Sequence, residues 1–482
     1  MQSDRYRMGF HITPPTGWLN DPNGLCQIDG TYHAFFQYSP EWPAPCAERG
    51  WAHATSSDLV RWEHHGWAIR ADAPFDASGA YSGCALVHPG AAAGAGAVDG
   101  AGAAAGTPAP SPDAPVVSFY YTGNVKEPGG FDYVHAGRQA NLVRVDSPDG
   151  FEMGEKQLLM GNADYPAYCS CHVRDPKIWR EEDGTGRLFM LLGARDRDGE
   201  GFVLVYASED GRSWHHVGDV RTEEPFGYMW ECPDRICLDG FEYLSCCPQG
   251  MEALGWANGV RDQAGYFTLA PGERLSQAPG VRTANFRRWD AGFDFYAPQT
   301  FVDETGRTIL IAWMGLPEPP FECAPHGLDW IHCLTVPRVL TRAVDGGIAQ
   351  TPVPELEAAR GAEALLGPAR TVALPAHRAD ILVEGAGEGL TVTLDDALEV
   401  RCAGGAVSLA FSDPRFGAGR TERALAVDGY GDLRILVDSS AVEVFASGGR
   451  AVFSTRWFPV AEGLIIGLRG PCERARAWPL EL

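Results

Sequence analysis

Asp21 is the first of three acidic residues whose surroundings could give them a chemical role. It lies in the segment Trp18-Leu-Asn-Asp-Pro-Asn-Gly24, which contains too many Pro, Gly and Asn residues to form a helix. Pro22 fixes the backbone directly after the carboxylate, so Asp21 is held at a bend. A carboxylate at a bend can be an Asx-turn residue that bonds only nearby backbone. Two further acidic residues make Asp21 a candidate for catalysis.

Asp175 and Glu231 have neighbours that would shift their pKa values in opposite directions. Asp175 follows Arg174, and an adjacent guanidinium lowers the pKa of a carboxyl and keeps it ionised. Glu231 lies between Trp230 and Cys232, and apolar surroundings raise the pKa of a carboxyl toward the range of a general acid. Either residue alone could equally belong to a structural ion pair or a turn. Together, two such carboxyls can split a glycosidic bond, one attacking the anomeric carbon and the other protonating the leaving oxygen.

A weak internal repeat indicates how these residues are brought together. The pattern Ser-x-Asp, a turn and a large apolar residue occurs at Ser56, Ser147 and Ser208, as expected for strands that end in tight turns. The first interval is longer because it contains residues 89–115, almost entirely Ala, Gly, Pro and Ser, which we expect to be a dispensable flexible loop. Without this loop both intervals are roughly 60 residues, the size of a four-stranded propeller blade. About five blades fit into residues 1–345 and would direct the three carboxyls to one axial pocket.

The C-terminal part has a different pattern. Residues 346–370 begin with a Pro-rich segment and are predicted to be a linker. Residues 371–482 alternate apolar and polar side chains with a period of two, which indicates antiparallel sheets that each bury one face. The sequence therefore predicts an all-β protein, a five-bladed β-propeller catalytic domain over residues 1–345 followed by a β-sandwich. The sandwich has no cluster of residue types typical of catalysis, and we expect it to be accessory.

Composition and charge exclude several classes of partner. The 482 residues include 39 basic and 63 acidic side chains, and the net charge of −24 argues against a nucleic-acid or anionic-membrane partner. No apolar run is long enough for a bilayer, and residues 1–8 do not resemble a signal peptide, so a cytoplasmic protein is expected. The 13 Cys residues are then expected to be reduced thiols. Cys169-Ser-Cys171-His172 lacks a second pair at ligand spacing, so neither a metal nor another cofactor is expected.

Three motifs resemble the signatures of glycoside hydrolase family 32, the β-fructofuranosidases. They are Trp18-Leu-Asn-Asp-Pro-Asn-Gly24, Arg174-Asp-Pro176 and Glu231-Cys232. Shorter matches run along almost the whole chain: Phe35-Phe-Gln-Tyr38, Trp51-Ala-His-Ala54, Tyr81-Ser-Gly83, Phe295-Tyr-Ala-Pro-Gln299, Ile311-Ala-Trp313 and Leu436-Val-Asp-Ser-Ser-Ala-Val-Glu-Val-Phe445. The resemblance also implies a five-bladed propeller followed by a β-sandwich.

The resemblance assigns roles to individual residues. It implies Asp21 as nucleophile, Glu231 as general acid/base and Asp175 as the stabiliser of the transition state. It implies that the sugar is bound by a further set of side chains: Trp18, Leu19, Asn20, Gln37, Trp42, Tyr81, Ser82, Arg174, Tyr296 and Trp313. Trp42 is included because the family commonly has a Trp where this chain has Pro45.

The substrate is expected to be a small sugar. Tyr228–Asp234, Cys247–Met251 and Leu334–Arg338 resemble the bacterial branch of the family that acts on sucrose-6-phosphate. The expected reaction is retaining hydrolysis of this substrate, and of sucrose, to release fructose through a covalent fructosyl-Asp intermediate. The alternatives are an invertase or fructo-oligosaccharide hydrolase without phosphate preference, fructosyl transfer to a second sugar, and a non-catalytic sugar-binding propeller. Ala52 and Glu322–His326 differ from the family, and the sequence identifies neither the phosphate-binding residues nor the oligomeric state.

Overall fold

The computed structural model describes residues 4–44, 48–88, 115–317, 328–366, 371–413, 416–417 and 419–482. The described residues do not include Pro45, residues 89–114 or Glu322–His326. The expectations stated above for these positions therefore remain predictions. Strands dominate the described part, and short 3₁₀ helices lie between them: η1 (Asp4–Tyr6), η2 (Asn162–Asp164), η3 (Gly255–Ala257), η4 (Leu275–Gln277), η5 (Thr283–Asn285), η6 (Pro354–Ala359) and η7 (Ser447–Gly449).

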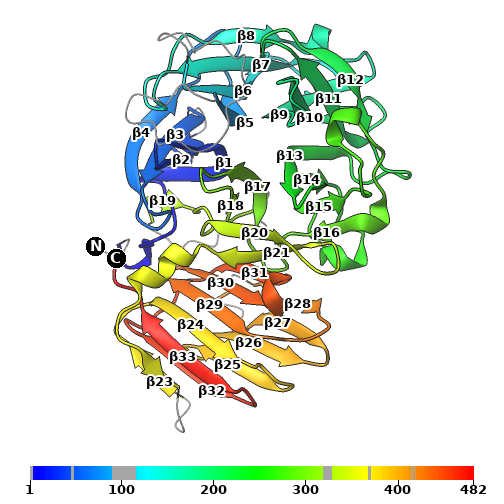
Figure 1. Cartoon of the computed structure of the whole chain (residues 1–482). Helices are drawn as coiled ribbons and strands as arrows, with labels where there is room; N and C mark the ends of the chain where they lie inside the picture. Colours follow the sequence, from blue (N-terminus) through cyan, green and yellow to red (C-terminus); the bar gives the residue numbers. More distant parts are fainter. Residues whose placement is uncertain are drawn as a thin grey trace.

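The described residues form five antiparallel blades around an axis, which confirms the predicted propeller (Figure 1). In chain order the blades are β1 (Gly17–Ile28), β2 (Thr31–Ser39), β3 (Gly50–Ser56) and β4 (Glu63–Ile69); β5 (Ala80–Val87), β6 (Val117–Lys126), β7 (Arg138–Ser147) and β8 (Gln157–Met160); β9 (Cys169–Arg180), β10 (Leu188–Asp196), β11 (Gly201–Ser208) and β12 (His215–Val220); β13 (Met229–Leu238), β14 (Phe241–Gln249), β15 (Gly265–Thr268) and β16 (Phe286–Arg288); β17 (Tyr296–Val302), β18 (Thr308–Trp313), β20 (Arg338–Arg342) and β21 (Ile348–Pro352). The first strand of each blade lies nearest the centre in Figure 1. β19 (Trp330–Ile331) pairs in parallel with β1, and β1 also contacts β17, so the ring closes between the first and fifth blades.

The Ser-x-Asp repeats form the predicted tight turns, each after the third strand of a blade. The hydroxyl and the carboxylate accept backbone N–H groups, as when Gly211 N donates to Ser208 Oγ (2.9 Å) and Arg212 N to Asp210 Oδ1 (2.8 Å). The turn at Ser147 has the same two bonds, at 2.9 and 2.8 Å. These local bonds fix the entry into the fourth strand of each blade.

The innermost strand of every blade contains a β-bulge at the same place. In each one, three steps along the first strand correspond to two steps along the second: from Leu19 to Pro22, from Ala80 to Gly83, from Arg174 to Lys177, from Glu231 to Asp234 and from Tyr296 to Gln299. A Pro lies in or at the end of four of the bulges, where its missing N–H costs no ladder bond. Asp175, Cys232 and Ala297 have φ values of 62°, 47° and 47°, a region that non-glycine residues seldom adopt. Because a bulge turns a side chain away from its regular direction, it can aim these residues at the axis.

The remaining strands form a sandwich of two six-stranded sheets, as predicted. One sheet has the order β22-β33-β24-β29-β30-β31 and the other β23-β32-β25-β26-β27-β28. Their bounds are β22 (Ala364–Leu365), β23 (Thr371–Leu374), β24 (Arg378–Glu384), β25 (Leu390–Leu394), β26 (Leu398–Ala403), β27 (Ala406–Phe411), β28 (Glu422–Ala426), β29 (Leu433–Asp438), β30 (Ala441–Ala446), β31 (Ala451–Arg456), β32 (Leu464–Arg469) and β33 (Arg474–Pro479).

The boundary between the domains differs from the prediction. β21 pairs with β20 in the fifth blade, so the propeller extends to Pro352, and residue 345 lies inside the β20–β21 hairpin. The short β21 follows a Gly-Gly turn and runs into a Pro-rich segment, which gives its sequence the character of a linker.

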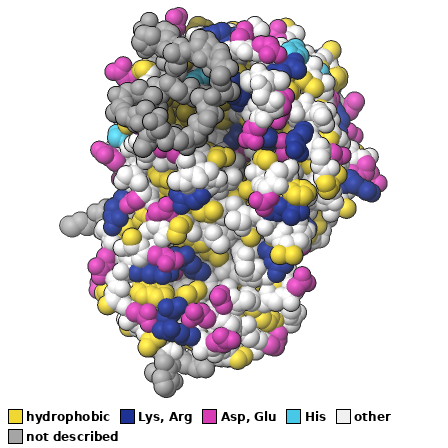
Figure 2. All heavy atoms as spheres, in the orientation of Figure 1, with side chains coloured by type: hydrophobic (Ala, Val, Ile, Leu, Met, Phe, Trp, Pro, Cys, Tyr) yellow, Lys and Arg dark blue, Asp and Glu magenta, His cyan; other side chains and the backbone are white. Residues whose placement is uncertain are grey.

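The surface carries both signs of charge. Figure 2 shows acidic and basic side chains interspersed on the face that it displays, with hydrophobic side chains between them. Within the described ranges, no helix has the length and apolar character needed to span a membrane.

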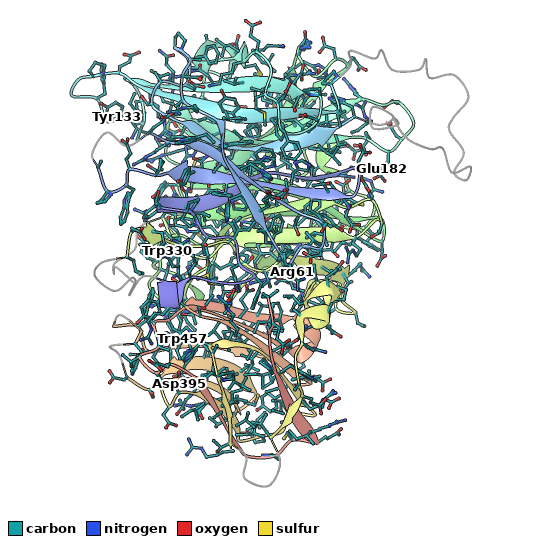
Figure 3. All side chains as sticks on the ribbon, turned by 90° about the vertical axis from the view of Figure 1, so that its left-hand side faces the viewer. Arg61, Tyr133, Glu182, Trp330, Asp395 and Trp457 are labelled. Carbon is teal, nitrogen blue, oxygen red and sulfur yellow. The ribbon has the colours of Figure 1, made fainter. Side chains whose placement is uncertain are left out.

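A buried polar network joins the two domains. Asp438 of β29 accepts the backbone N–H groups of Gly9, Phe10 and His11 at 2.7, 2.9 and 3.1 Å. The His11 ring lies between Asp438 (2.9 Å) and Glu443 of β30 (3.0 Å). Burial by itself lowers the pKa of His11, but the bonds and charges of both carboxylates outweigh it and raise the pKa to about 9. Figure 3 labels buried Trp330 in the propeller and Trp457 in the sandwich, on either side of this junction.

Candidate active site

A cavity of about 440 Å³ lies where the bulged strands converge. Predicted site residues that line it are Trp18, Asn20, Asp21, Gln37, Trp42, Tyr81, Ser82, Arg174, Asp175, Glu231, Tyr296 and Trp313. Further lining residues are Tyr38, Ser39, Ala44, Arg49, Arg138 and Pro317. The three carboxyls come from the first, third and fourth blades, so only the closed ring brings them together.

Leu19 is the one predicted substrate-binding residue that does not line the cavity. Its side chain is fully buried in a hydrophobic cluster with Ile12 and Phe36. Successive side chains of a strand point to opposite faces, so Trp18 and Asn20 face the cavity while Leu19 faces the core. The assignment of Leu19 to the substrate is therefore corrected to a packing role.

Asp21 is held by donors to both carboxyl oxygens. Ser82 Oγ donates to Asp21 Oδ2 (2.5 Å), and Asn20 Nδ2 donates to Oδ1 (2.9 Å). Trp18 Nε1 in turn donates to Asn20 Oδ1 (2.9 Å), which orients the amide. Burial raises the pKa of Asp21, the charge of Glu231 adds to this, and the bonds from Ser82 and Asn20 oppose it. The pKa of Asp21 therefore lies above its ordinary value, and the two neighbouring donors limit the rise.

Asp175 does not have the lowered pKa that its sequence neighbour predicts. Burial raises the pKa of Asp175 to about 7, since it outweighs the opposing charge of Arg174, and the charge of Glu231 raises it further. Arg174 Nε lies 3.9 Å from Asp175 Oδ2, whereas its Nη2 donates to Glu231 Oε1 at 2.7 Å. The Arg174 guanidinium therefore hydrogen-bonds Glu231 and lies farther from Asp175. Asp175 Oδ2 instead accepts the backbone N–H of Cys232 (3.0 Å).

The carboxyl of Glu231 has polar surroundings, contrary to the apolar environment expected from its neighbours in sequence. Tyr296 Oη and Gln249 Nε2 donate to Glu231 Oε2 at 2.7 and 2.8 Å, while Arg174 occupies Oε1. Trp230 is fully buried on the opposite side of the strand. Both oxygens of the Glu231 carboxyl therefore accept hydrogen bonds, from residues of three other strands.

One thiol marks how close two of the carboxyls are. Cys232 Sγ lies 3.8 Å from both Asp21 Oδ2 and Asp175 Oδ2. A hydrogen bond between the thiols of Cys232 and Cys247, together with burial, raises the pKa of Cys232 well above its usual value. The Cys232 thiol therefore stays protonated beside the two carboxyls. Across the described residues, no group of three or more His, Cys, Asp or Glu side chains is arranged to hold a metal ion.

Aromatic rings form one wall of the cavity. The Trp18 ring lies 5.3 Å from that of Trp42, 5.9 Å from that of Trp313 and 4.5 Å from that of His332, measured between ring centroids. Flat apolar faces beside a few placed polar groups are typical of small-ligand sites. Gln37 is fixed beside this wall by a bond to the carbonyl of Ala80 in the next blade (3.0 Å).

Sequence reasoning missed several residues that shape the site. Gln249 donates to Glu231, and His172 bonds Arg174. Both residues lie within motifs named above, but neither their type nor their spacing marks them as site residues. Arg49 and Arg138 belong to no motif. Their presence in the cavity depends on the packing of neighbouring blades, and this packing cannot be predicted from the residues next to them in sequence.

Comparison with known proteins agrees with the motifs. The model of the Glycosyl hydrolases family 32 N-terminal domain matches residues 11–352, and that of the family 32 C terminal matches residues 406–468. A sucrose-6-phosphate hydrolase of Bacillus subtilis is 32% identical over 479 residues, covering 95% of this chain and 90% of the relative. A raffinose invertase of Escherichia coli is 33% identical over 487 residues, covering 95% and 91%. The structure of sucrose-6-phosphate hydrolase from Lactobacillus gasseri superposes with a TM-score of 0.82 at 25% identity, covering 100% of this chain and 94% of that chain.

Proposed function

Because the chain belongs to glycosyl hydrolase family 32, we propose that it is a retaining β-fructofuranosidase that hydrolyses sucrose-6-phosphate, and also sucrose, to release fructose. The observation that carries the proposal is the meeting of Asp21, Asp175 and Glu231 from three blades in one cavity. The similarity to sucrose-6-phosphate hydrolases over nearly the full length supports the phosphorylated substrate. Such a substrate suits a cytoplasmic enzyme, since phosphorylated sucrose arises during uptake into the cell.

In the first step Asp21 is the nucleophile. Its carboxylate attacks the anomeric carbon of the fructosyl unit, and the bond from that carbon to the bridging oxygen breaks. Glu231, in its protonated form, gives its proton to this oxygen, so the glucosyl half leaves as an alcohol. The fructosyl unit remains as an ester of Asp21.

In the second step water displaces Asp21, attacking from the face on which the leaving sugar departed. Glu231, now ionised, takes a proton from water while the water oxygen attacks the anomeric carbon, and the ester bond to Asp21 breaks. Each displacement inverts the anomeric carbon, so the two displacements together retain its configuration. Arg174, Gln249 and Tyr296 orient the Glu231 carboxyl through both steps. Asp175 is proposed to bond the fructosyl hydroxyls and to stabilise the charge that develops on the sugar ring.

Asp21→Asn tests the nucleophile. The substitution nearly preserves the shape of the side chain, and kcat should fall by about 10⁴-fold or more on both substrates. Unimpaired cleavage by the variant would refute the role of Asp21. A wild-type protein that binds these sugars without cleaving them would refute the enzyme and favour a sugar-binding propeller.

The similarity to a raffinose invertase favours a second candidate, a β-fructofuranosidase that does not require the phosphate. The two readings differ in one ratio, kcat/KM on sucrose-6-phosphate divided by kcat/KM on sucrose. The proposed function expects a ratio well above one, and a ratio of one would assign the chain to the second candidate. Product analysis at high sucrose concentration tests fructosyl transfer in the same preparation.

A further inference from the structure

Two arginines line the cavity without serving the catalytic carboxyls. Arg174 is neutralised by Glu231, but Arg49 and Arg138 have no ion-pair partner in the part of the chain that the structure describes. Other buried arginines either pair with carboxylates, as Arg338 does with Glu443, or donate to backbone carbonyls, as Arg456 does to Ser440. The protein has a net charge of −24, yet this cavity contains two guanidiniums without an ion-pair partner among the described residues. Because it costs free energy to bury an unpaired charge, this arrangement indicates a binding role.

Arg138, at the start of β7, is held in place but not neutralised. Its Nε donates to Asn124 Oδ1 (2.8 Å), and its guanidinium carbon lies 5.6 Å from the centre of the Tyr81 ring. Its Nη1 lies 3.4 Å from His172 Nε2. Burial and the charges of Arg174 and Arg138 lower the pKa of His172 to about 2, so this imidazole is neutral and supplies no negative charge.

The local field disfavours the charge that Arg138 carries. Burial, and then the nearby charge of Arg174, lower the pKa of Arg138, and the charges of Tyr81, Glu231 and Asp175 oppose this only in part. A guanidinium nevertheless remains protonated in proteins. An anion that entered the cavity next to Arg138 would relieve this repulsion, which a neutral sugar hydroxyl would not do.

Arg49 reaches the same cavity from the neighbouring blade. It precedes β3, and its backbone carbonyl accepts the N–H of Ala80 (3.1 Å), the residue before Tyr81. The side chain is exposed, with no hydrogen bond or ion pair recorded for its guanidinium within the described residues. Two arginines from two blades are thus both anchored next to Tyr81, one half-buried and one at the rim.

We propose that Arg138 and Arg49 form the subsite that binds the phosphate monoester of the leaving sugar. The proposal rests on the proposed function and names the residues that distinguish sucrose-6-phosphate from sucrose. A phosphate monoester carries close to two negative charges at neutral pH, and its oxygens match the donor fork of a guanidinium. With the fructosyl unit at the carboxyls, the glucosyl half and its phosphate would occupy the rest of the same cavity, which Arg138 and Arg49 also line.

The test is the ratio of kcat/KM on sucrose-6-phosphate to kcat/KM on sucrose, at one ionic strength. It is measured for the wild type, Arg138→Gln, Arg138→Lys and Arg49→Gln. Arg138→Gln should lower the ratio by roughly ten- to a hundredfold, mainly through the KM for the phosphorylated substrate. Arg138→Lys should retain part of the preference, and the exposed Arg49 should contribute less. Arg469→Gln, an exposed charge change on β32 of the sandwich, is the matched control and should leave the ratio unchanged.

Product inhibition gives an independent measurement. Glucose 6-phosphate should inhibit the wild type more strongly than glucose does, and Arg138→Gln should remove most of that difference. If Arg138→Gln does not fold, the ratios of Arg138→Lys and Arg49→Gln decide. A wild type without preference for the phosphorylated substrate overturns the proposed substrate. A wild type with the preference and variants that keep it overturn the arginine subsite alone.

Discussion

Replacing Ser82 by Ala removes the shortest hydrogen bond to the proposed nucleophile. Ser82 Oγ donates to Asp21 Oδ2 at 2.5 Å, and this bond stabilises the ionised carboxylate more than the protonated carboxyl. A hydrogen bond to a charged group contributes about 1.5–3 kcal/mol, and one pKa unit corresponds to about 1.36 kcal/mol. The substitution should therefore raise the pKa of Asp21 by about one to two units, since Asn20 still donates to the other oxygen.

The assay is the pH dependence of kcat/KM on sucrose from about pH 4 to pH 9, which reports groups of the free enzyme. The nucleophile must be ionised, so the acidic limb of the Ser82→Ala profile should move to higher pH by about one to two units. Activity should recover toward the wild-type level above this limb. Ser82 makes no recorded bond to Asp175, so a displaced limb would assign it to Asp21.

Ser39→Ala is the control for removing a hydroxyl from the cavity. Ser39 Oγ is buried and has no hydrogen-bond partner among the described residues, so its loss should leave the limb in place. A Ser82→Ala profile that is lower at every pH, with its limb unmoved, would refute the reasoning. Ser82 would then act on the sugar and not on the carboxylate.

Two further predictions concern the fold. Leu19→Ala should lower the free energy of unfolding by about 2–5 kcal/mol in urea denaturation and leave KM unchanged, because Leu19 packs in the core; a raised KM with unchanged stability would restore it to the substrate site. The pKa of His11 is raised from 6.5 to about 9, so its contribution is complete below about pH 6.5 and is lost as pH rises through 9. The melting temperature of the wild type should fall across this window more than that of His11→Gln, and parallel curves would contradict the raised pKa.

The architecture and most of the site follow from local sequence. The conformations of the Ser-x-Asp turns and of the residues next to Pro depend on only a few neighbouring residues. One sequence is therefore enough to predict which residues lie in strands and which lie in bends. The bulges turn those steps toward the axis, which is why Asp21 and Asp175 reach the cavity together.

The errors concern properties set by residues distant in sequence. Arg174 seemed to belong to Asp175, but Glu231, 57 positions after Arg174, receives the guanidinium once two blades pack together. Trp230 and Cys232 suggested an apolar setting for Glu231, yet the carboxyl meets polar groups from other strands. Leu19 was assigned with the motif around it, although the alternation of a strand separates it from its neighbours.

The anchoring of the N-terminal segment has a consequence for synthesis of the chain. β1 carries Asp21 and leaves the ribosome early, but its partner β19 is made much later. The carboxylate of Asp438, which secures the segment before β1, comes 427 positions after His11. Contacts so distant in sequence form late in folding. We therefore expect the segment before β1 to be secured only after the sandwich has formed. A fragment ending after the fifth blade would contain Asp21, Asp175 and Glu231 and the β1–β19 pairing, but it would lack the Asp438 carboxylate that holds this segment.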